Sequence, residues 1–302
     1  MADNHRNHLS QILGIPAERL SLASVSGGYI SQAFRVTIES ENGTQQLFAK
    51  ANSSDFLDNF RAEADGLKRL ATPAVLRVPQ PRTIQSINGH AYLVMDWIIK
   101  PSDHHTSNST RFYEKFGRQL AELHRATSGR QIGLDYDNFL GAAKQINSPE
   151  SSWHQFFAKH RLGFQLQWGL TQHLITNELR NLVEKIIDLL PKILATNDST
   201  TSLLHGDLWS GNYLMDQQGE PVLIDPAIYH GHREAEFGML KLFGGCPQRF
   251  YDAYEEAWPL EAGWQSRSQV YVLYHLLNHL NLFGQSYLAD CLRLGQKISQ
   301  AA

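Results

Sequence analysis

Cysteine is scarce in this sequence of 302 residues, where only Cys246 and Cys291 are present. Two cysteines cannot build the disulfide framework of a small secreted protein, so a reduced intracellular chain is the simpler interpretation. Long hydrophobic runs are also missing, and the longest fall far short of the ~20 residues needed to cross a bilayer. The polar start, MADNHRNHLSQ, has no apolar segment typical of a signal peptide. These absences predict a soluble, cytoplasmic protein with no membrane partner.

The chain has no large excess of charge of either sign. It contains 27 Lys and Arg against 30 Asp and Glu, a formal net charge of −3. No basic surface for general nucleic-acid binding is therefore expected. Hydrophobic residues make up 42% of the chain, which is ample for a packed core, and the length predicts two domains or lobes. The sequence does not indicate the oligomeric state.

Short strands dominate the first hundred residues. Segments 20–25 and 34–38 flank a Ser-Gly-Gly turn, and a hairpin is predicted at 41–44 because Asn-Gly favours positive φ angles. A strand at 47–51 follows. After it, Asp55 could cap a helix that runs to about residue 70.

One position on this predicted helix carries a charge on its apolar face. Phe56, Phe60 and Leu67 form an apolar stripe at helical spacing. The remaining position of the stripe, where an apolar residue is expected, is Glu63. A buried carboxylate is costly unless a cation pairs with it. Lys50, on the preceding strand, is the nearest candidate in the sequence, although it could also be a strand-edge lysine that guards against aggregation.

The pattern changes after residue 99. A strand-like run at 90–99 (HAYLVMDWII) leads into a polar linker at 102–110. Apolar residues then recur at helical spacing in four segments: 112–123, 153–166, 179–190 and 270–280. Short strand-like segments interrupt this pattern within 203–224. We predict an α+β architecture with an N-terminal lobe (1–99), a small antiparallel sheet with one helix, and a larger, mainly helical C-terminal lobe (100–302).

The richest stretch for chemistry is 203–226, LLHGDLWSGNYLMDQQGEPVLIDP. Asp207 and Asn212 flank a Ser-Gly turn that can fold both side chains toward one point, and Asp225 ends the returning strand, which predicts that it lies beside Asn212. A carboxylate and an amide oxygen suit a hard cation such as Mg²⁺. A second carboxylate, free of the metal, suits a general base for a hydroxyl. His205 is expected to brace the loop.

These residues resemble a known pattern. His205-Gly206-Asp207 with Asn212 resembles the catalytic loop H-x-D-x-x-x-x-N of the kinase superfamily, and Asp225 falls where the metal-binding aspartate lies. The longer HGDLWSGN, followed by DPA and LFGG, resembles the fructosamine (ketosamine) kinase family. The resemblance runs nearly end to end and includes these segments: EADGLKRL (63–70), GLDYDNFLG (133–141), FFAKHRLGFQL (156–166) and VYVLYHLLNHLNLFG (270–284).

The resemblance implies a two-lobed, protein-kinase-like fold and an ATP- and Mg²⁺-dependent kinase. Its substrates would be ketosamines such as fructosamine or ribulosamine, phosphorylated at the sugar O3, with a role in deglycation. Asp207 would accept the proton of the hydroxyl, and Asn212 and Asp225 would hold Mg²⁺. Lys50 would contact the α- and β-phosphates while paired to Glu63.

The resemblance also implies a nucleotide site in the first hundred residues. The backbone of a hinge strand would meet the adenine, and its residues are Met95, Asp96, Trp97 and Ile98. A loop at 26–31 would cover the phosphates with its backbone N–H groups, using Gly27 and Gly28, although a simple hairpin turn explains the two glycines as well. Tyr29 stands where some family members have a cysteine, so a redox switch there is not expected.

Five residues are candidates for the substrate pocket: Trp209, Asp137, Asn138, Arg161 and Glu234. The Trp209 ring can face the sugar or be an ordinary core aromatic. Asp137, Asn138 and Arg161 lie in segments specific to the family, but a helix cap or an ion pair explains such residues equally well. Glu234 and Glu236 follow the metal aspartate closely and could support the site or bind the substrate amine.

Other functions remain open from the sequence. A related kinase acting on an aminoglycoside, choline or another hydroxylated amine would share the same phosphotransfer residues. A non-catalytic nucleotide-binding protein would have no need of Asp207. A metal-dependent hydrolase could use His205, Asp207 and Asp225, but clustered histidine ligands are lacking. The preferred sugar is open, as is whether the amine is free or protein-bound.

Overall fold

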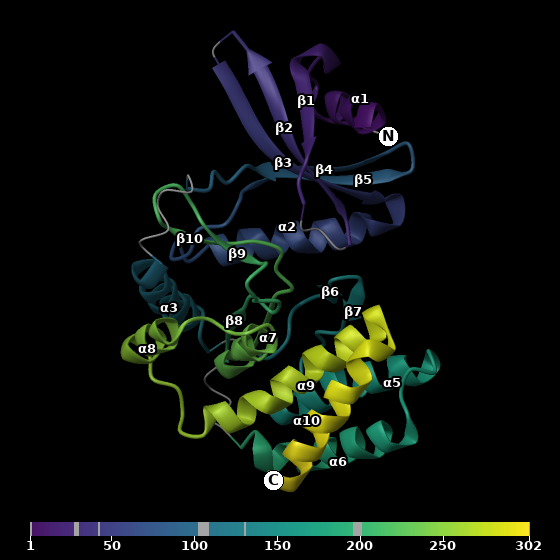
Figure 1. Ribbon diagram of the computed structural model, residues 1–302, viewed down its shortest axis with the longest axis vertical. Helices are drawn as coiled ribbons and strands as arrows, with labels where there is room; N and C mark the ends of the chain where they lie inside the picture. The colour runs from purple at the N-terminus through teal and green to yellow at the C-terminus, as the bar shows by residue number, and fades with distance from the viewer. Residues whose placement is uncertain are drawn as a thin grey trace. The chain divides into compact units, whose positions relative to one another are not determined.

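The computed structural model describes these residues of the chain: 2–26, 30–41, 43–101, 109–129, 131–195 and 201–301. The chain forms two compact units, which Figure 1 shows with their helices and strands labelled. The first unit comprises Met1–Ser107 and Leu214–Asp225, and the second comprises Asn108–Tyr213 and Pro226–Ala302. The segment Leu214–Asp225 thus belongs to the first unit, because it contacts residues that lie far earlier in the chain.

The first unit is built on one antiparallel sheet of five strands, in the order β1, β2, β3, β5, β4. A 3₁₀ turn, η1 (Ala17–Arg19), precedes the sheet. The strands are β1 (Leu20–Ser24), β2 (Gln32–Ser40), β3 (Gly43–Ser53), β4 (Pro81–Ile87) and β5 (His90–Asp96). Ser40 lies opposite Gly43, so β2 and β3 form the hairpin that the Asn-Gly pair predicts. β5 ends at Asp96, three residues earlier than the predicted strand.

One face of this sheet is covered by an N-terminal helix, α1 (Ala2–Leu13), which lies beside β1 in Figure 1. Side chains alternate between the faces of a strand. Leu47, Ala49 and Ala51 of β3 are accordingly buried in one core with Leu9 of α1. The sequence pattern does not predict α1, because the buried face beside Leu9 is made of histidines rather than aliphatic residues.

A second helix, α2 (Leu57–Ala71), follows β3 as predicted, but it starts later. The chain first makes a 3₁₀ turn, η2 (Ser54–Phe56), so Asp55 lies inside this turn and its side chain does not cap α2, contrary to the prediction. Phe60 and Leu67 are fully buried, as the apolar stripe predicts.

The segment Leu214–Asp225 is fixed to the first unit by Arg77. This segment includes most of a hairpin between β9 (Tyr213–Met215) and β10 (Pro221–Leu223). The Leu223 N–H donates to the Arg77 carbonyl at 3.0 Å, and the Arg77 guanidinium pairs with the carboxylate of Asp216, which is buried. The chain therefore approaches Asp225 on an anchored strand.

The second unit is mainly helical. Its helices are α3 (Ser109–Ala126), α4 (Trp153–Phe157), the π-helix η4 (Ala158–Gly163), α5 (Phe164–Thr171), α6 (Asn177–Ile193), η6 (Arg233–Ala235), α7 (Glu236–Leu242), α8 (Gln248–Ala257), α9 (Trp264–Phe283), η7 (Gln285–Tyr287) and α10 (Leu288–Ala301). Two short antiparallel pairs complete it: β6 (Asn138–Leu140) with β7 (Ala143–Gln145), and β8 (Thr201–Leu204) with β11 (Tyr229–His232).

The core of the second unit gathers around α9. This helix packs against α5, α7 and α10, and α10 also packs against α6, an arrangement visible at the yellow end of Figure 1. The helical spacing predicted at 179–190 and 270–280 is confirmed by buried residues on both helices: Leu179, Val183, Ile186, Leu190, Val270, Leu273, Leu277 and Leu280. None of the helices described here is both long and apolar enough to cross a membrane.

Candidate active site

Lys50 lies at the centre of the candidate residues of the first unit. Its Nζ atom donates to Glu63 Oε1 at 2.8 Å and forms an ion pair with Asp225 Oδ1 at 2.7 Å. β3 supplies Lys50, α2 supplies Glu63, and Asp225 follows β10. The pairing of Lys50 with Glu63 that the apolar stripe predicts is therefore present, and Asp225 joins it.

Burial and charge oppose each other in this cluster. Burial alone would lower the pKa of Lys50, but the charges of Asp225 and Glu63 outweigh it and raise that pKa above its ordinary value. Burial raises the pKa of Glu63, the nearby Asp225 adds to the rise, and Lys50 opposes it. Lys50 is therefore firmly protonated, and its charge keeps two nearby carboxylates together.

Asp225 has an unusual backbone. Its φ angle is +56°, in the left-handed region that non-glycine residues rarely adopt. Such a conformation costs of order 1 kcal/mol and persists where surrounding contacts enforce it. Here the anchored strand before it and the Lys50 ion pair hold Asp225 in place, with its side chain 41% exposed.

In the second unit, Asp207 and Asn212 meet as the turn between them predicts. The Asn212 amide Nδ2 donates to the Asp207 carbonyl at 2.8 Å and to its carboxylate Oδ2 at 3.0 Å. The Asn212 backbone N–H donates to the carbonyl of Trp209 at 2.8 Å, which closes the turn. Both donor contacts leave the amide oxygen of Asn212 as the atom that could bind a cation.

A buried carboxylate supports this loop from behind. Glu236 accepts the backbone N–H of His205 at 2.6 Å and that of Gly206 at 3.1 Å. Burial would raise the pKa of Glu236, but the nearby His124 and the His205 contacts outweigh it, so the pKa is lowered and the carboxylate stays charged. The Asp207 N–H donates to His205 Nδ1 at 3.3 Å, so His205 braces the loop as expected. The sequence places Glu236 near the site but gives no signal of this contact.

Gly206 has a conformation that requires glycine. Its φ angle is +81°, and a Cβ atom there would lie 2.1 Å from the carbonyl oxygen of Ala227. The Ala227 N–H donates to the carbonyl of His205 at 2.8 Å. The loop that leads to Asp207 is thus packed directly against the backbone that follows Asp225.

The predicted hinge residues lie at the end of β5 and just beyond it. Met95 and Asp96 are its last two residues, while Trp97 and Ile98 follow the strand, and Met95 and Ile98 are buried. The Trp97 ring lies 6.2 Å from the ring of Phe48 on β3. The strand and its exit are therefore both held by β3, the strand through backbone pairing and Trp97 through its aromatic contact with Phe48.

The predicted phosphate-covering loop can be followed only at its end. Gly27, Gly28 and Tyr29 lie outside the described residues. Beyond them, the Asn52 side chain donates to the carbonyl of Ile30 and to the hydroxyl of Ser31, both at 3.0 Å. These contacts attach the end of the loop to β3, two residues from Lys50.

Trp209 lies at the surface of the loop between Asp207 and Asn212. Its ring is half-buried and stands 5.2 Å from the ring of Phe243, whose exposed fraction is 39%. A Cβ atom on Gly211 would lie 2.4 Å from the Trp209 ring, so glycine lets the ring fold over the loop. The two aromatic rings form a partly exposed apolar surface, and Trp209 is two residues beyond Asp207 in the chain.

The other substrate candidates are held by protein contacts. Asp137 accepts the backbone N–H of Asn147 at 2.9 Å and lies 3.3 Å from Lys144. Asn138 is buried and donates to a backbone carbonyl. Arg161 is fully buried, with its guanidinium 4.2 Å from the centre of the Tyr229 ring. Asn138 and Arg161 are therefore enclosed by the protein.

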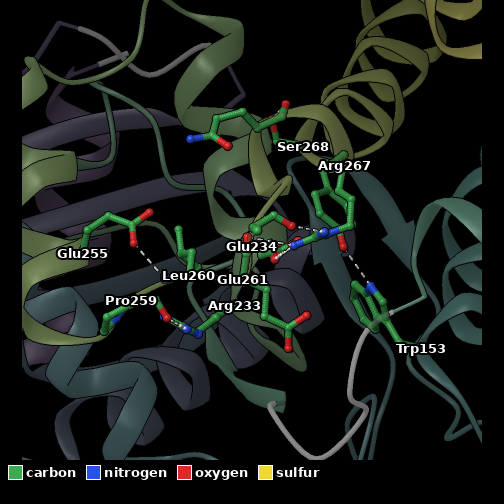
Figure 2. Close-up of polar contacts among 12 residues, drawn as sticks. Trp153, Arg233, Glu234, Glu255, Pro259, Leu260, Glu261, Arg267 and Ser268 are labelled. Carbon is green, nitrogen blue, oxygen red and sulfur yellow. Dashed lines mark hydrogen bonds and ion pairs between the residues drawn. The ribbon is translucent and has the colours of Figure 1, made fainter. Parts of the chain in front are cut away.

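Glu234 is also engaged inside the protein. Figure 2 shows the Arg267 side chain of α9 directed at Glu234, with both carboxylate oxygens in contact with the guanidinium and Oε2 at 2.7 Å from Nε. Figure 2 also shows Arg233 reaching the carbonyl of Pro259. The residues at η6 thus tie the start of α7, and with it Glu236, to α9 and the loop before it.

Comparisons with known proteins agree with the sequence pattern. A family model described as fructosamine kinase matches residues 1–300. The chain is 39% identical over 293 residues to a probable ketoamine kinase of Synechocystis. The aligned region covers 95% of each chain. A solved structure of a putative fructosamine-3-kinase from Thermobifida fusca has a TM-score of 0.82 and 31% identity, covering 100% of both chains.

An aminoglycoside phosphotransferase solved with ADP and hygromycin B shares the fold at a TM-score of 0.66 and 16% identity, covering 98% of this chain and 96% of that one. The predicted α+β, protein-kinase-like fold is therefore confirmed. The match to the family model extends over almost the whole chain, and the ketoamine kinase matches at a similar coverage. The chain belongs to the fructosamine kinase family.

Proposed function

We propose that the protein is an ATP-dependent kinase that phosphorylates the O3 hydroxyl of ketosamines such as fructosamine and ribulosamine. O3 forms a bond to the γ-phosphorus of ATP, the bond from that phosphorus to the β,γ-bridging oxygen breaks, and ADP leaves. The hydroxyl proton passes to Asp207. One observation carries the proposal: in a chain of this family, Asp207 is held by Asn212 at 3.0 Å in a loop with the spacing of a kinase catalytic loop.

Asp207 is suited to act as the base. Its backbone is fixed through His205 and Gly206 by the buried Glu236, and its carboxylate accepts a hydrogen bond from Asn212. A fixed base within reach of the hydroxyl lowers the barrier by positioning, since the protein does little covalent chemistry in phosphoryl transfer.

The nucleotide is assigned to the first unit. Lys50 would contact the α- and β-phosphates, and Glu63 would hold the ammonium in position. The backbone at 95–98 would meet the adenine, and Gly27 and Gly28 would cover the phosphates with their N–H groups.

The residues present fit Mg²⁺. The amide oxygen of Asn212 and the carboxylate of Asp225 are the hard oxygen donors that this cation prefers. Asp225 pairs with Lys50 and its side chain is 41% exposed, so its carboxylate is accessible. When bound, the cation would supply positive charge to the phosphates of ATP.

Trp209 and Phe243 are assigned to the acceptor. Their partly exposed rings would pack on the apolar part of a small-molecule or protein-bound ketosamine, beside the base. Phosphorylation at O3 destabilises the adduct and frees the amine, so the role is deglycation. A cytoplasmic location is part of this proposal.

An acceptor screen tests the proposal. ATP turnover is measured with ketosamines, amino alcohols and aminoglycosides, in wild-type protein and in Asp207→Asn. We expect turnover on ketosamines and a loss of about 10²-fold or more in kcat in the variant, the scale of losing a general base. Turnover on aminoglycosides and on no ketosamine would overturn the substrate assignment, while full activity of Asp207→Asn would overturn the role of the base.

A further inference from the structure

Two buried amides of the β6–β7 hairpin bind the backbone just after Asp225. Asn138 Nδ2 donates to the carbonyl of Ile228 at 2.7 Å, and Gln145 Nε2 donates to the carbonyl of Ala227 at 3.0 Å. The two amides also bind each other, since Gln145 Nε2 donates to Asn138 Oδ1 at 2.8 Å. Asn138 and Gln145 are both about 2% exposed, so these contacts are shielded from water.

The carbonyl that Gln145 binds is the one that faces the catalytic loop. The Ala227 oxygen is the atom that a Cβ on Gly206 would meet at 2.1 Å, and the Ala227 N–H donates to the carbonyl of His205. The peptide groups around Ala227 are therefore in contact with the two residues that precede Asp207. A rotation of the Ala227 carbonyl would displace Gly206 and with it Asp207.

Further side chains fix the two amides. The Tyr274 hydroxyl of α9 donates to Gln145 Oε1 at 3.1 Å, and Asn147 Nδ2 donates to Asn138 Oδ1 at 2.8 Å. Arg161 Nη2 in turn donates to Asn147 Oδ1 at 2.9 Å. The acceptor oxygens of all three amides are thus occupied.

This network has a cost that packing alone does not explain. A buried amide must be fully hydrogen-bonded to avoid a desolvation penalty, and apolar side chains of similar size would fill the same space without that requirement. A complete polar network instead fixes one arrangement of its members. Here that arrangement sets the orientation of the carbonyls of Ala227 and Ile228.

We propose that Asn138 and Gln145 are positioning residues for the catalytic loop, acting through the backbone of Ala227 on His205, Gly206 and Asp207. This inference rests on the proposed function for its kinetic consequence. Asn138 therefore acts through the protein and does not contact the substrate.

Gln145→Met tests this role, because methionine has nearly the same size and cannot donate to Ala227. We expect kcat to fall about 10-fold or more, as for a misplaced base, with the KM for ATP within about twofold of wild type. Lys144→Ala, in the same hairpin with a side chain 58% exposed, is the matched control and should keep the wild-type kcat. Wild-type kcat in folded Gln145→Met would overturn the proposal.

A double variant separates positioning from general damage. If Gln145 acts through Asp207, then adding Gln145→Met to Asp207→Asn should lower the residual rate by less than about threefold. If the two losses multiply in full, the proposal is wrong. If Gln145→Met does not fold, Tyr274→Phe replaces it, because this variant removes only the hydroxyl that binds Gln145. We then expect a smaller decrease in kcat, again with an unchanged KM for ATP.

A measurement without substrate keeps this test independent of the proposed function. Hydrogen–deuterium exchange of the segment 204–212 should be faster in Gln145→Met or Tyr274→Phe than in wild type, with exchange in β3 unchanged. Unchanged exchange at 204–212 would contradict the proposal even if the protein used a different acceptor. A failed acceptor screen with faster exchange would instead contradict only the proposed substrate.

Discussion

The Lys50 ammonium pairs with two carboxylates, so we expect this one strand residue to affect both ATP binding and stability. It pairs with Glu63 at 2.8 Å and with Asp225 at 2.7 Å, and its side chain is 12% exposed. Removing one partner of a buried pair leaves the others uncompensated, which costs more than the pair itself contributes.

Lys50→Met should raise the KM for ATP about 10-fold or more and destabilise the fold by about 3 kcal/mol. Glu63, left buried without a cation, would titrate above its ordinary pKa, so the loss of stability should grow as the pH rises. ATP kinetics and urea unfolding at pH 6 and pH 8 check this expectation. Lys68→Met, an exposed lysine on α2, is the control. Equal stability of Lys50→Met and wild type at pH 8 would contradict the account.

Residue patterns predict the parts of the site that are local. The slot in an apolar stripe is enough to pair Lys50 with Glu63, and a Ser-Gly turn is enough to bring Asp207 to Asn212. Glu236 is different, because it takes two backbone N–H groups that lie some thirty residues earlier in the chain. No local spacing reports such a contact.

At the scale of elements, α1 shows what periodicity misses. Its buried face combines Leu9 with His5 and His8, whose Nδ1 atoms lie 2.7 and 2.8 Å from the hydroxyl of Tyr92 on β5. A helix whose buried side is partly polar has a weak apolar pattern, and the hydrogen bonds of both rings to the Tyr92 hydroxyl, with that of His8 to Asn88, allow their burial. The β6–β7 hairpin is a similar case, since its amides gain their partners from distant segments.

The contacts of α1 predict a pH dependence. Burial, together with His90 on β5, lowers the pKa of both His5 and His8 below the ordinary value, and His8 lowers that of His5 further. The Gln32 side chain on β2 opposes the shift at His5. The unfolded chain therefore binds more protons, so the stabilisation is complete above about pH 6.5 and is lost as the pH falls below it.

The temperature at the midpoint of thermal unfolding should therefore decrease as the pH is lowered from 7 to 5. The exchange protection of residues 2–13 should decrease over the same range. The double variant His5→Gln and His8→Gln keeps hydrogen-bonding groups toward Tyr92 without titrating, so it should lose much of this dependence. An equal pH slope in the double variant and in wild type would show that other groups cause it.

At the scale of the whole molecule, the candidate residues divide between the two units. Lys50, Glu63 and Asp225 belong to the first, and Asp207 and Asn212 to the second. The α+β architecture follows from hydrophobic periodicity, which is strong in long helices such as α6. Hydrophobic periodicity does not predict that Leu214–Asp225 belongs to the first unit, because this membership depends on Arg77 binding a strand far along the chain.

The reaction that we propose places a phosphate on the O3 oxygen of a ketosamine. The most direct test is phosphorus NMR of the product formed from ATP, Mg²⁺ and a fructosamine or ribulosamine. We expect a new phosphate monoester coupled to the proton on C3, with one ADP formed for each ester, and a signal that grows about 10²-fold more slowly with Asp207→Asn. Hydrolysis of ATP to inorganic phosphate without any ester, or an ester at another oxygen of the sugar, would contradict it.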